Sequence, residues 1–204
     1  MIQLAAFLGN PGRKYEHNRH NVPWILAEAL PFYSSLSWQK KFKGQYACYS
    51  NEGQIHLLKP ETYMNLSGES VQAAAAFYKI NIENIIVVHD ELELPLGTIS
   101  LKFSGGLGGH NGLRSMKQCF GSADFWRLRI GIGRPDSRLP GEGGAAGKAD
   151  SGIVDWVLTD FSAEELEKLK AVFESGTDLL MQTFSCDPET LLNDWKKKVC
   201  NERV

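Results

Sequence analysis

A histidine and an aspartate in this sequence have the chemistry to activate water. His20 follows the turn segment 9–12, and Asp90 ends an apolar run. An aspartate that accepts the Nδ1–H of a histidine fixes the tautomer and leaves Nε2 as a base. No serine or cysteine stands in a nucleophile-elbow context. The pair therefore predicts general-base catalysis on water, although His20 alone equally fits a capping or surface role, and Asp90 a turn role.

Three asparagines are candidate donors to a reacting carbonyl group. Asn10, Asn65 and Asn111 lie beside glycine or in turn-like segments. One well-placed amide donor contributes about 10²–10³-fold to such a reaction. Asparagine in these contexts also serves turns and helix caps, so both roles stay open for all three.

The glycine-rich segment 104–112 favours close approach of its backbone to a ligand. No Gly-Lys-Ser/Thr follows it, so it is not a Walker loop. The helix expected after it presents free N–H groups that suit an anion. Lys102 before this segment, and Arg127 and Arg129 after it, are candidates to hold a phosphate.

The distribution of charge says more than the net charge of −2. Residues 103–138 contain six basic and two acidic side chains, whereas residues 139–204 contain seven basic and thirteen acidic ones. An acidic tail thus hides a basic middle, and phosphate binding depends on the local field. By itself, this charge excess also fits a solvated face.

Composition argues against metals, cofactors and membranes. The four cysteines are scattered without a C-x-x-C spacing, which predicts reduced thiols and no metal site. No window approaches the ~18–20 apolar residues of a membrane span. The apolar N-terminus lacks a basic n-region, so we expect a cytoplasmic protein that needs no cofactor and no membrane.

Two apolar strands are expected to position the catalytic pair. Residues 2–8 and 85–89 are mostly apolar and show no polar–apolar alternation, which is typical of strands buried on both faces. Helices between strands predict an α/β fold, a mixed β-sheet flanked by helices. In such sheets sites form beyond the carboxyl ends of strands, where both Asp90 and the segment leading to His20 would lie.

The remaining pattern predicts one catalytic domain over residues 1–204. Asn51-Glu52-Gly53 between 45–50 and 54–58 indicates a hairpin. Ser67 is the expected N-cap of a helix to about residue 79, and Ser162 opens a capping box. Further strands are expected at 98–102 and 127–133, further helices at 21–30, 111–120, 162–183 and 188–198, and a glycine-rich inserted loop at about 136–152.

Five separated motifs together resemble the bacterial-type peptidyl-tRNA hydrolases. They occur in the order found in that family and cover most of residues 2–161. The motifs are Gly9–Val22 (through Tyr15 and Arg19-His20-Asn21), Lys59–Gly68, Asp90–Gly97, Gly108–Leu113 and Arg127–Pro135. The resemblance fades in the C-terminal helices, at about 162–198.

The resemblance implies a monomer that hydrolyses the ester between a peptide, or an N-blocked aminoacyl group, and the 3′ end of tRNA. The freed tRNA returns to translation. His20 matches the catalytic base, Asp90 the residue that orients it, and Asn10 the residue that distinguishes blocked from free aminoacyl ends. The positions matching substrate contacts are Tyr15, Tyr63, Met64, Asn65 and Asn111, with Lys102 and Arg129 as the phosphate clamp.

Four histidines other than His20 remain to be interpreted. We expect His110 to support the His20–Asp90 pair, although direct substrate contact fits its motif equally well. His17, His56 and His89 are expected to be structural or surface residues.

The sequence departs from the family pattern at three places. Pro23 stands where glycine is usual, and should stiffen the turn after His20. Ser100 stands where some members have another lysine, so the basic clamp is expected to be thinner. Residues 138–152 resemble an insertion beside the expected tRNA face, which we expect to be inert.

Two other function classes compete with hydrolysis of peptidyl-tRNA. One is an RNA-binding module on the same fold, like the plant intron-splicing relatives; the intact His20 and Asp90 argue against it. The other is a hydrolase of small esters or amides, which would have no use for phosphate-binding residues such as Lys102 and Arg129.

Overall fold

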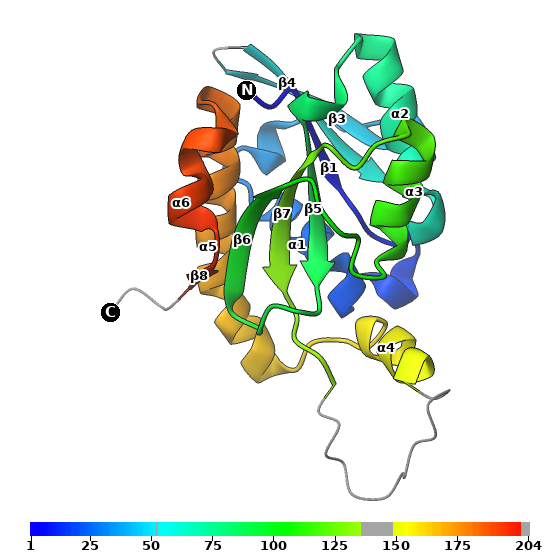
Figure 1. The fold of residues 1–204 in the computed structure, drawn as a ribbon, viewed down its shortest axis with the longest axis vertical. Coiled ribbons are helices and arrows are strands. Elements are labelled where there is room, and N and C mark those ends of the chain that lie inside the picture. The colour runs from blue at the N-terminus through cyan, green and yellow to red at the C-terminus, as the bar shows by residue number, and fades with distance from the viewer. Residues whose placement is uncertain (52, 136–148, 201–204) are drawn as a thin grey trace, which may run out of the picture.

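An eight-stranded mixed sheet forms the centre of the computed structural model, which describes residues 1–51, 53–135 and 149–200 (Figure 1). The strand order is β2-β3-β4-β1-β5-β7-β6-β8. Strands β4, β1, β5 and β7 run parallel, while β3 and β6 run antiparallel to their neighbours. The strands are β1 Leu4–Phe7, β2 Gln39–Lys41, β3 Gly44–Asn51, β4 Gly53–Pro60, β5 Ile85–Glu91, β6 Thr98–Phe103, β7 Trp126–Gly131 and β8 Lys198–Val199.

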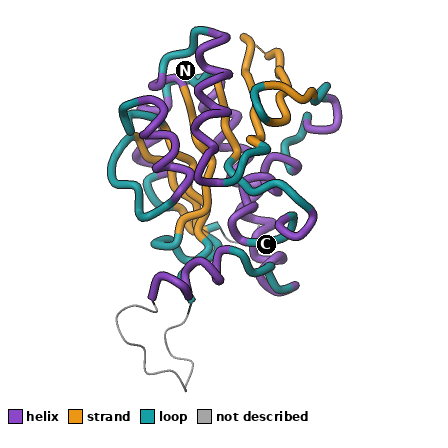
Figure 2. Tube along the Cα trace, turned by 90° about the vertical axis from the view of Figure 1, so that its right-hand side faces the viewer, coloured by secondary structure: helices purple, strands orange, loops and turns teal. Residues whose placement is uncertain are grey.

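Helices cover both faces of the sheet, so the predicted single α/β domain with a mixed sheet is confirmed. One core contains Leu26 of α1 and Leu169 of α5, and the other contains Val71 of α2 and Leu113 of α3. Figure 2 shows the layers from the side. The helices are α1 Val22–Glu28, α2 Ser67–Tyr78, α3 Asn111–Phe120, α4 Ala149–Val157, α5 Ala163–Ser185 and α6 Leu192–Trp195.

Strand β1 is buried on both faces, as its unbroken apolar run predicts. Leu4 and Ala6 belong to the core under α2 and α3, whereas Ala5 and Phe7 belong to the core under α1 and α5. Successive side chains of a strand point to opposite faces, so each face receives alternate residues. This burial fixes the strand next to β5 and β4, at the centre of the sheet.

The predicted N-cap of α5 is confirmed, whereas the predicted N-cap of α2 is wrong. Ser162 and Glu165 form the predicted capping box of α5. Ser67, expected as an N-cap, is instead the first residue of α2; its side chain is buried and caps no backbone N–H. The Ser67 hydroxyl lies 3.9 Å from Met64 Sδ, because a 3-10 turn, Met64–Leu66, leads directly into the helix.

Several elements were not predicted. Strand β2, helix α4 and strand β8 lack a clear hydrophobic period, and the expected helix at 188–198 breaks into a 3-10 turn, Pro188–Leu191, then α6 and β8. The expected inserted loop lies mostly outside the described residues, and its last four residues, 149–152, begin α4. Of the described helices, none is long and apolar enough to cross a membrane.

The parallel strands β5 and β7 end on the side of the molecule where α4 lies (Figure 1). The backbone of 17–19 is tied to the segment after α4: Arg19 N donates to Thr159 O at 3.0 Å, and Phe161 N donates to His17 O at 3.3 Å. Helix α4 and the turn that carries His20 are therefore joined at the carboxyl edge of the sheet.

Candidate active site

His20 and Asp90 meet at the carboxyl edge of the sheet, as predicted. His20 lies in the 3-10 turn Arg19–Asn21, and Asp90 lies near the end of β5. His20 Nδ1 is 2.8 Å from Asp90 Oδ1. The His20 side chain is 11% exposed and that of Asp90 is 2% exposed. A carboxylate this deeply buried is stabilised only when donors such as the histidine N–H satisfy it.

His110 is the second partner of Asp90. Its Nε2 lies 3.0 Å from the same Oδ1 of Asp90. Its Nδ1 accepts from the backbone N–H of Gly112 at 3.1 Å and of Leu113 at 3.4 Å, so His110 caps α3. A neutral imidazole has one N–H. The backbone of α3 therefore holds the His110 proton on Nε2, aimed at Asp90.

The two histidines keep Asp90 ionised. Burial by itself raises the pKa of the Asp90 carboxyl, but the electrostatic attraction and hydrogen bonds of His20 and His110 outweigh burial and hold the pKa well below its usual range. An ionised Asp90 accepts from His20 Nδ1–H, which leaves the Nε2 of His20 as the basic nitrogen.

Asn10 is held in place by Asn21, a residue that the sequence analysis did not single out. Asn21 Oδ1 accepts from Asn10 N at 2.8 Å, and Asn21 Nδ2 donates to Asn10 O at 2.9 Å. The side-chain Oδ1 of Asn10 accepts from Met64 N at 2.9 Å. With its oxygen occupied, Asn10 offers its Nδ2 as a donor. The signal for Asn21 was its place in the first family motif, directly after His20.

The segment 63–65 brings Tyr63, Met64 and Asn65 close to Asn10 through that bond. Met64 is buried, whereas Tyr63 and Asn65 are exposed. Helix α3 approaches closely here: a Cβ on Gly112 would lie 2.6 Å from Met64 Sδ and 2.7 Å from Leu8 Cδ1. Glycine at 112 therefore lets α3 pack against this turn.

A cavity of about 500 Å³ opens beside His20. His20, Asp90, His110 and Asn111 contribute to its wall, while the other predicted site residues lie outside that wall. The sequence analysis missed the α4 side of the cavity. The lining residues are His20, His89, Asp90, Glu91, Leu92, Leu107, Gly108, Gly109, His110, Asn111, Arg114, Arg134, Ile153, Val154 and Val157.

Lys102 and Arg129 lie outside the cavity on the adjacent strands β6 and β7, both half-buried. Arg129 Nη2 donates to Ser100 Oγ at 2.8 Å, and its Nη1 lies 3.6 Å from a Glu91 carboxylate oxygen. Tyr15 is half-buried at the end of a 3-10 turn, Arg13–Tyr15, with Lys14 Nζ 4.7 Å from its ring centroid.

Arg127 has a structural role, contrary to its suggested part in phosphate binding. It is 2% exposed. Its Nη1 donates to Gly106 O at 2.6 Å and its Nη2 to Gly105 O at 2.9 Å. Both terminal nitrogens are thus occupied by carbonyl groups of the glycine-rich segment, which Arg127 holds against the sheet.

Arg19 anchors the turn that carries His20. Its Nη1 donates to Thr159 Oγ1 and to Asp160 O, both at 2.7 Å, and its Nη2 pairs with the Glu165 carboxylate at 2.7 and 2.8 Å. The guanidinium also lies 3.9 Å from the Trp156 ring centroid. A bidentate pair of this kind restricts the orientation of both partners.

His20, Asp90 and His110 have ligand atoms within 4.8 Å of one another, so this cluster is also the candidate metal site of the described residues. His20 Nδ1 and His110 Nε2 both lie at hydrogen-bond distance from Asp90 Oδ1, and His110 carries its proton on Nε2. A metal would need that nitrogen deprotonated. The donors as arranged fit a hydrogen-bonded triad better than a metal.

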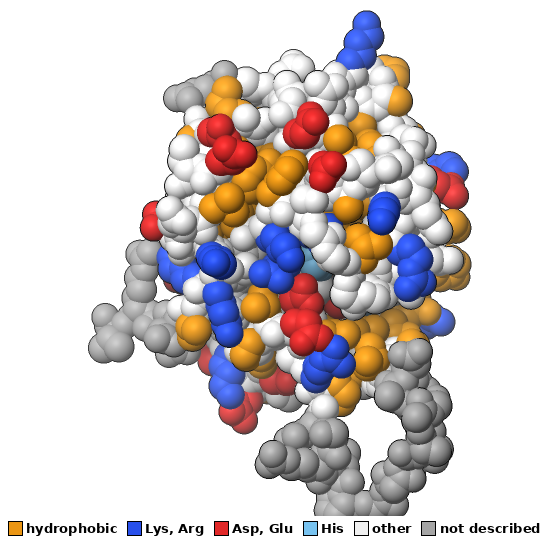
Figure 3. Space-filling view, viewed as in Figure 1, with side chains coloured by type: hydrophobic (Ala, Val, Ile, Leu, Met, Phe, Trp, Pro, Cys, Tyr) orange, Lys and Arg blue, Asp and Glu red, His pale blue; other side chains and the backbone are white. Residues whose placement is uncertain are grey.

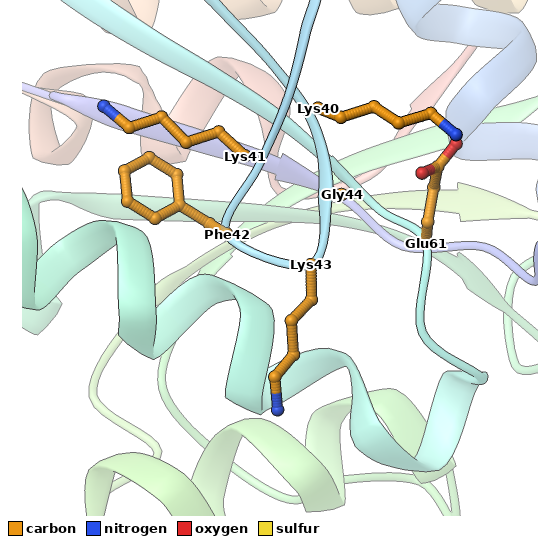
Figure 4. Close-up of a pocket in the computed structure, with 6 residues that line it drawn as sticks. All are labelled: Lys40, Lys41, Phe42, Lys43, Gly44 and Glu61. Carbon is orange, nitrogen blue, oxygen red and sulfur yellow. The ribbon is translucent and has the colours of Figure 1, made fainter.

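A second cavity, of about 440 Å³, lies at the turn between β2 and β3, far along the sheet from β6. In Figure 4 the side chains of Lys41 and Lys43 point apart, and Lys40 points toward Glu61. Lys43 pairs with Glu69 at 2.7 Å, and Lys41 donates to Tyr78 Oη at 3.2 Å. Two of its three lysines therefore already have partners.

Comparisons with known proteins agree with the motifs. The profile of the family described as "Peptidyl-tRNA hydrolase" matches residues 4–203. The chain belongs to the peptidyl-tRNA hydrolase family. A peptidyl-tRNA hydrolase of Treponema pallidum is 47% identical, over 97% of this chain and 96% of that relative. One of Neisseria gonorrhoeae is 39% identical, over 96% and 94% of the two chains.

The fold agrees with the family as well. The crystal structure of the Acinetobacter baumannii peptidyl-tRNA hydrolase superimposes with a TM-score of 0.78 at 34% identity, covering 96% of each chain. These relatives are all named peptidyl-tRNA hydrolase, so the chain is an enzyme of the peptidyl-tRNA hydrolase family.

Proposed function

We propose that this enzyme hydrolyses the ester bond between a peptide, or an N-blocked aminoacyl group, and tRNA, with His20 as the general base. The 2.8 Å approach of His20 Nδ1 to the buried carboxylate of Asp90 carries the proposal. The family and the cavity beside His20 support the choice of substrate. The enzyme would act in the cytoplasm, as a monomer, and release tRNA for translation.

In the proposed mechanism, Nε2 of His20 takes a proton from water as its oxygen attacks the ester carbonyl carbon. The C=O electrons move to oxygen and form a tetrahedral intermediate. That intermediate collapses by breaking the bond to the tRNA 3′ oxygen, which receives the proton from His20. Asp90 stabilises the transient imidazolium, and the base supplies about 10²–10⁴-fold in rate.

Asn10 is proposed to select substrates whose amino end is blocked. The Met64 N–H occupies Asn10 Oδ1, and Asn21 fixes the Asn10 backbone. The remaining Nδ2–H suits a carbonyl acceptor of a peptide. A free ammonium end would place donor against donor, and an unpaired polar group in this nearly buried setting costs about 1–3 kcal/mol.

The other proposed substrate contacts divide by chemistry. Asn65 and Asn111 have amides suited to the peptide or the terminal nucleotide, and Met64 gives an apolar neighbour. Exposed or half-buried rings, on Tyr63 and Tyr15, are suited to stacking on bases. Lys102 and Arg129 would neutralise phosphates, at a distance from the reacting ester.

We propose that His110 acts through Asp90, because its Nε2–H contacts that carboxylate and its Nδ1 is occupied by the start of α3. The competing RNA-binding module would have no use for an ionised Asp90 and two histidines that share it. A hydrolase of small esters would have no use for Lys102 and Arg129.

Release of a labelled N-acetylaminoacyl group from tRNA tests the proposed activity. We expect His20→Ala to lose about 10²–10⁴-fold in rate while tRNA binding is retained. His17→Ala removes an exposed histidine three residues away and serves as the control. Equal rates for His20→Ala and the wild type would refute the role of His20, and faster cleavage of an uncharged small ester would favour the small-ester class.

The phosphate clamp has its own test. Lys102→Ala should weaken tRNA binding and reduce the slope of log affinity against log salt by about one, while single-turnover hydrolysis at saturating enzyme changes little. A loss of affinity that is independent of salt would argue against a phosphate contact.

A further inference from the structure

The C-terminal segment adds a basic edge to the sheet. Strand β8 pairs antiparallel with β6 through Thr98–Val199 and Ile99–Lys198. Cys200 N donates to Gly97 O at 2.8 Å and continues this pairing. Lys196, Lys197 and Lys198 all have exposed side chains on this segment. Backbone pairing thus fixes a run of three lysines next to the strand that carries Lys102.

The neighbouring strands present their basic residues on one face. Leu101 of β6 and Leu128 of β7 pair with each other and point into the core under α5. Residues that alternate with them, Lys102 and Arg129 among them, therefore point to the opposite face. Figure 3 shows lysine and arginine side chains gathered over the region of β6, β7 and β8.

Ser100 connects the two basic groups. This residue is fully buried. Its Oγ accepts from Arg129 Nη2 at 2.8 Å and donates to the backbone carbonyl of Lys196. The buried serine thus ties the guanidinium of Arg129 to the backbone of the lysine run.

The three lysines differ in how they are engaged. Lys198 Nζ lies 3.9 Å from the centroid of the buried Trp195 ring, so Lys198 holds the segment against the core. Within the described part of the chain, the ion pairs include none from Lys196 or Lys197. Exposed ammonium groups without acidic partners are suited to phosphate oxygens.

We propose that Lys196 and Lys197 extend the Lys102–Arg129 clamp into a broader surface that binds backbone phosphates of tRNA beyond its 3′ end. The proposal rests on the proposed function for the identity of the nucleic acid. The acidic C-terminal third of the sequence would thereby contribute two cations to RNA binding.

Binding of deacylated tRNA at several salt concentrations tests this proposal. The double variant Lys196→Gln/Lys197→Gln should weaken binding and reduce the salt slope by about one per lysine. Lys40→Gln/Lys43→Gln removes the same charge from the hairpin at the opposite edge of the sheet and should leave the slope unchanged. Thermal unfolding midpoints of both variants establish that they are folded.

A second readout uses a substrate without the RNA stem. An N-acetylaminoacyl ester on a terminal trinucleotide should be hydrolysed by the Lys196/Lys197 variant at the wild-type rate. An unchanged salt slope, or equal changes in the two double variants, would overturn the proposal. Because deacylated tRNA is the probe, this outcome is separate from the proposed activity, whose failure would appear as a wild-type enzyme unable to hydrolyse the ester.

Discussion

Asn21 holds Asn10 by both of its backbone polar groups, at 2.8 Å through Asn10 N and at 2.9 Å through Asn10 O. A single amide side chain thereby joins the loop after β1 to the turn that carries His20. Asn21 is fully buried and Asn10 is nearly so, hence both bonds are shielded from water. The proposed base and the proposed selector of blocked substrates share this one connection.

Replacing Asn21 with aspartate should damage activity and stability together. The change keeps the shape of the side chain but replaces the Nδ2 donor with an oxygen. Two acceptors, this carboxylate oxygen and the carbonyl oxygen of Asn10, would then face each other. Loss of one buried hydrogen bond costs about 1–3 kcal/mol. We expect a lower unfolding midpoint and at least a tenfold loss of kcat/KM on N-acetylaminoacyl-tRNA.

Discrimination between blocked and free aminoacyl-tRNA separates this effect from simple destabilisation. If Asn21 positions Asn10, the variant should also lose preference for the blocked ester, measured below its unfolding midpoint. Unchanged preference with lower stability would leave Asn21 a purely structural residue. Asn84→Asp, which makes the same exchange just before β5 where Asn84 Nδ2 donates to Gln3 Oε1, is the matched control.

His110→Ala should lower kcat more than it raises KM. The substitution removes the Nε2–H that contacts Asp90 and the cap of α3, and with them one of the two donors that depress the Asp90 pKa. We expect about a tenfold to hundredfold loss in kcat, measured in single turnovers. An increase in KM alone would instead indicate direct contact of His110 with the substrate.

Stability should fall as the pH drops below about 6.5, because of His89. Burial first, and then the charge of His110, lowers the pKa of His89 well below 6.5. The unfolded chain therefore binds more protons than the folded protein below that pH, and stability is lost as pH falls toward the folded pKa. Urea unfolding at pH 7.5 and 5.5 measures the difference.

The variant His89→Asn provides the control for this pH dependence. It removes one titrating group and should reduce the change in the free energy of unfolding between pH 7.5 and 5.5, while the part due to His56, whose pKa burial also lowers, remains. Asp90, whose folded pKa is also depressed, contributes stability that is present above about 4 and is lost only at lower pH. An unchanged slope in His89→Asn would assign the loss to another group.

Removal of metal should leave the rate unchanged. Dialysis against a chelator tests this directly, since His20, Asp90 and His110 are the group that could hold an ion among the residues that the structure describes. Added Zn²⁺ should inhibit, because an ion bound there would occupy nitrogens that the proposed mechanism needs for protons. Loss of activity on chelation, restored by a divalent ion, would contradict the metal-independent mechanism.

Local patterns along the chain were enough to predict the class of the fold and the residues of the family motifs. The apolar runs at 2–8 and 85–89 have one stable outcome, a strand with both faces covered, and this placed Asp90 at the carboxyl edge. The capping box at Ser162 is equally local, since its bonds join residues three apart. Strands and helix caps whose pattern lies within a single element could therefore be predicted from the sequence.

Several contacts between distant parts of the chain could be identified only after the fold was known. The bonds from Asn21 to Asn10 and from Arg127 to Gly105 and Gly106 link separate elements, and no local pattern in the sequence predicts them. The same holds for β8: two residues pair with β6 only because the folded sheet offers an open edge there. Long-range pairing, which depends on the finished fold, assigned Arg127 to the scaffold and brought the C-terminal lysines beside Lys102.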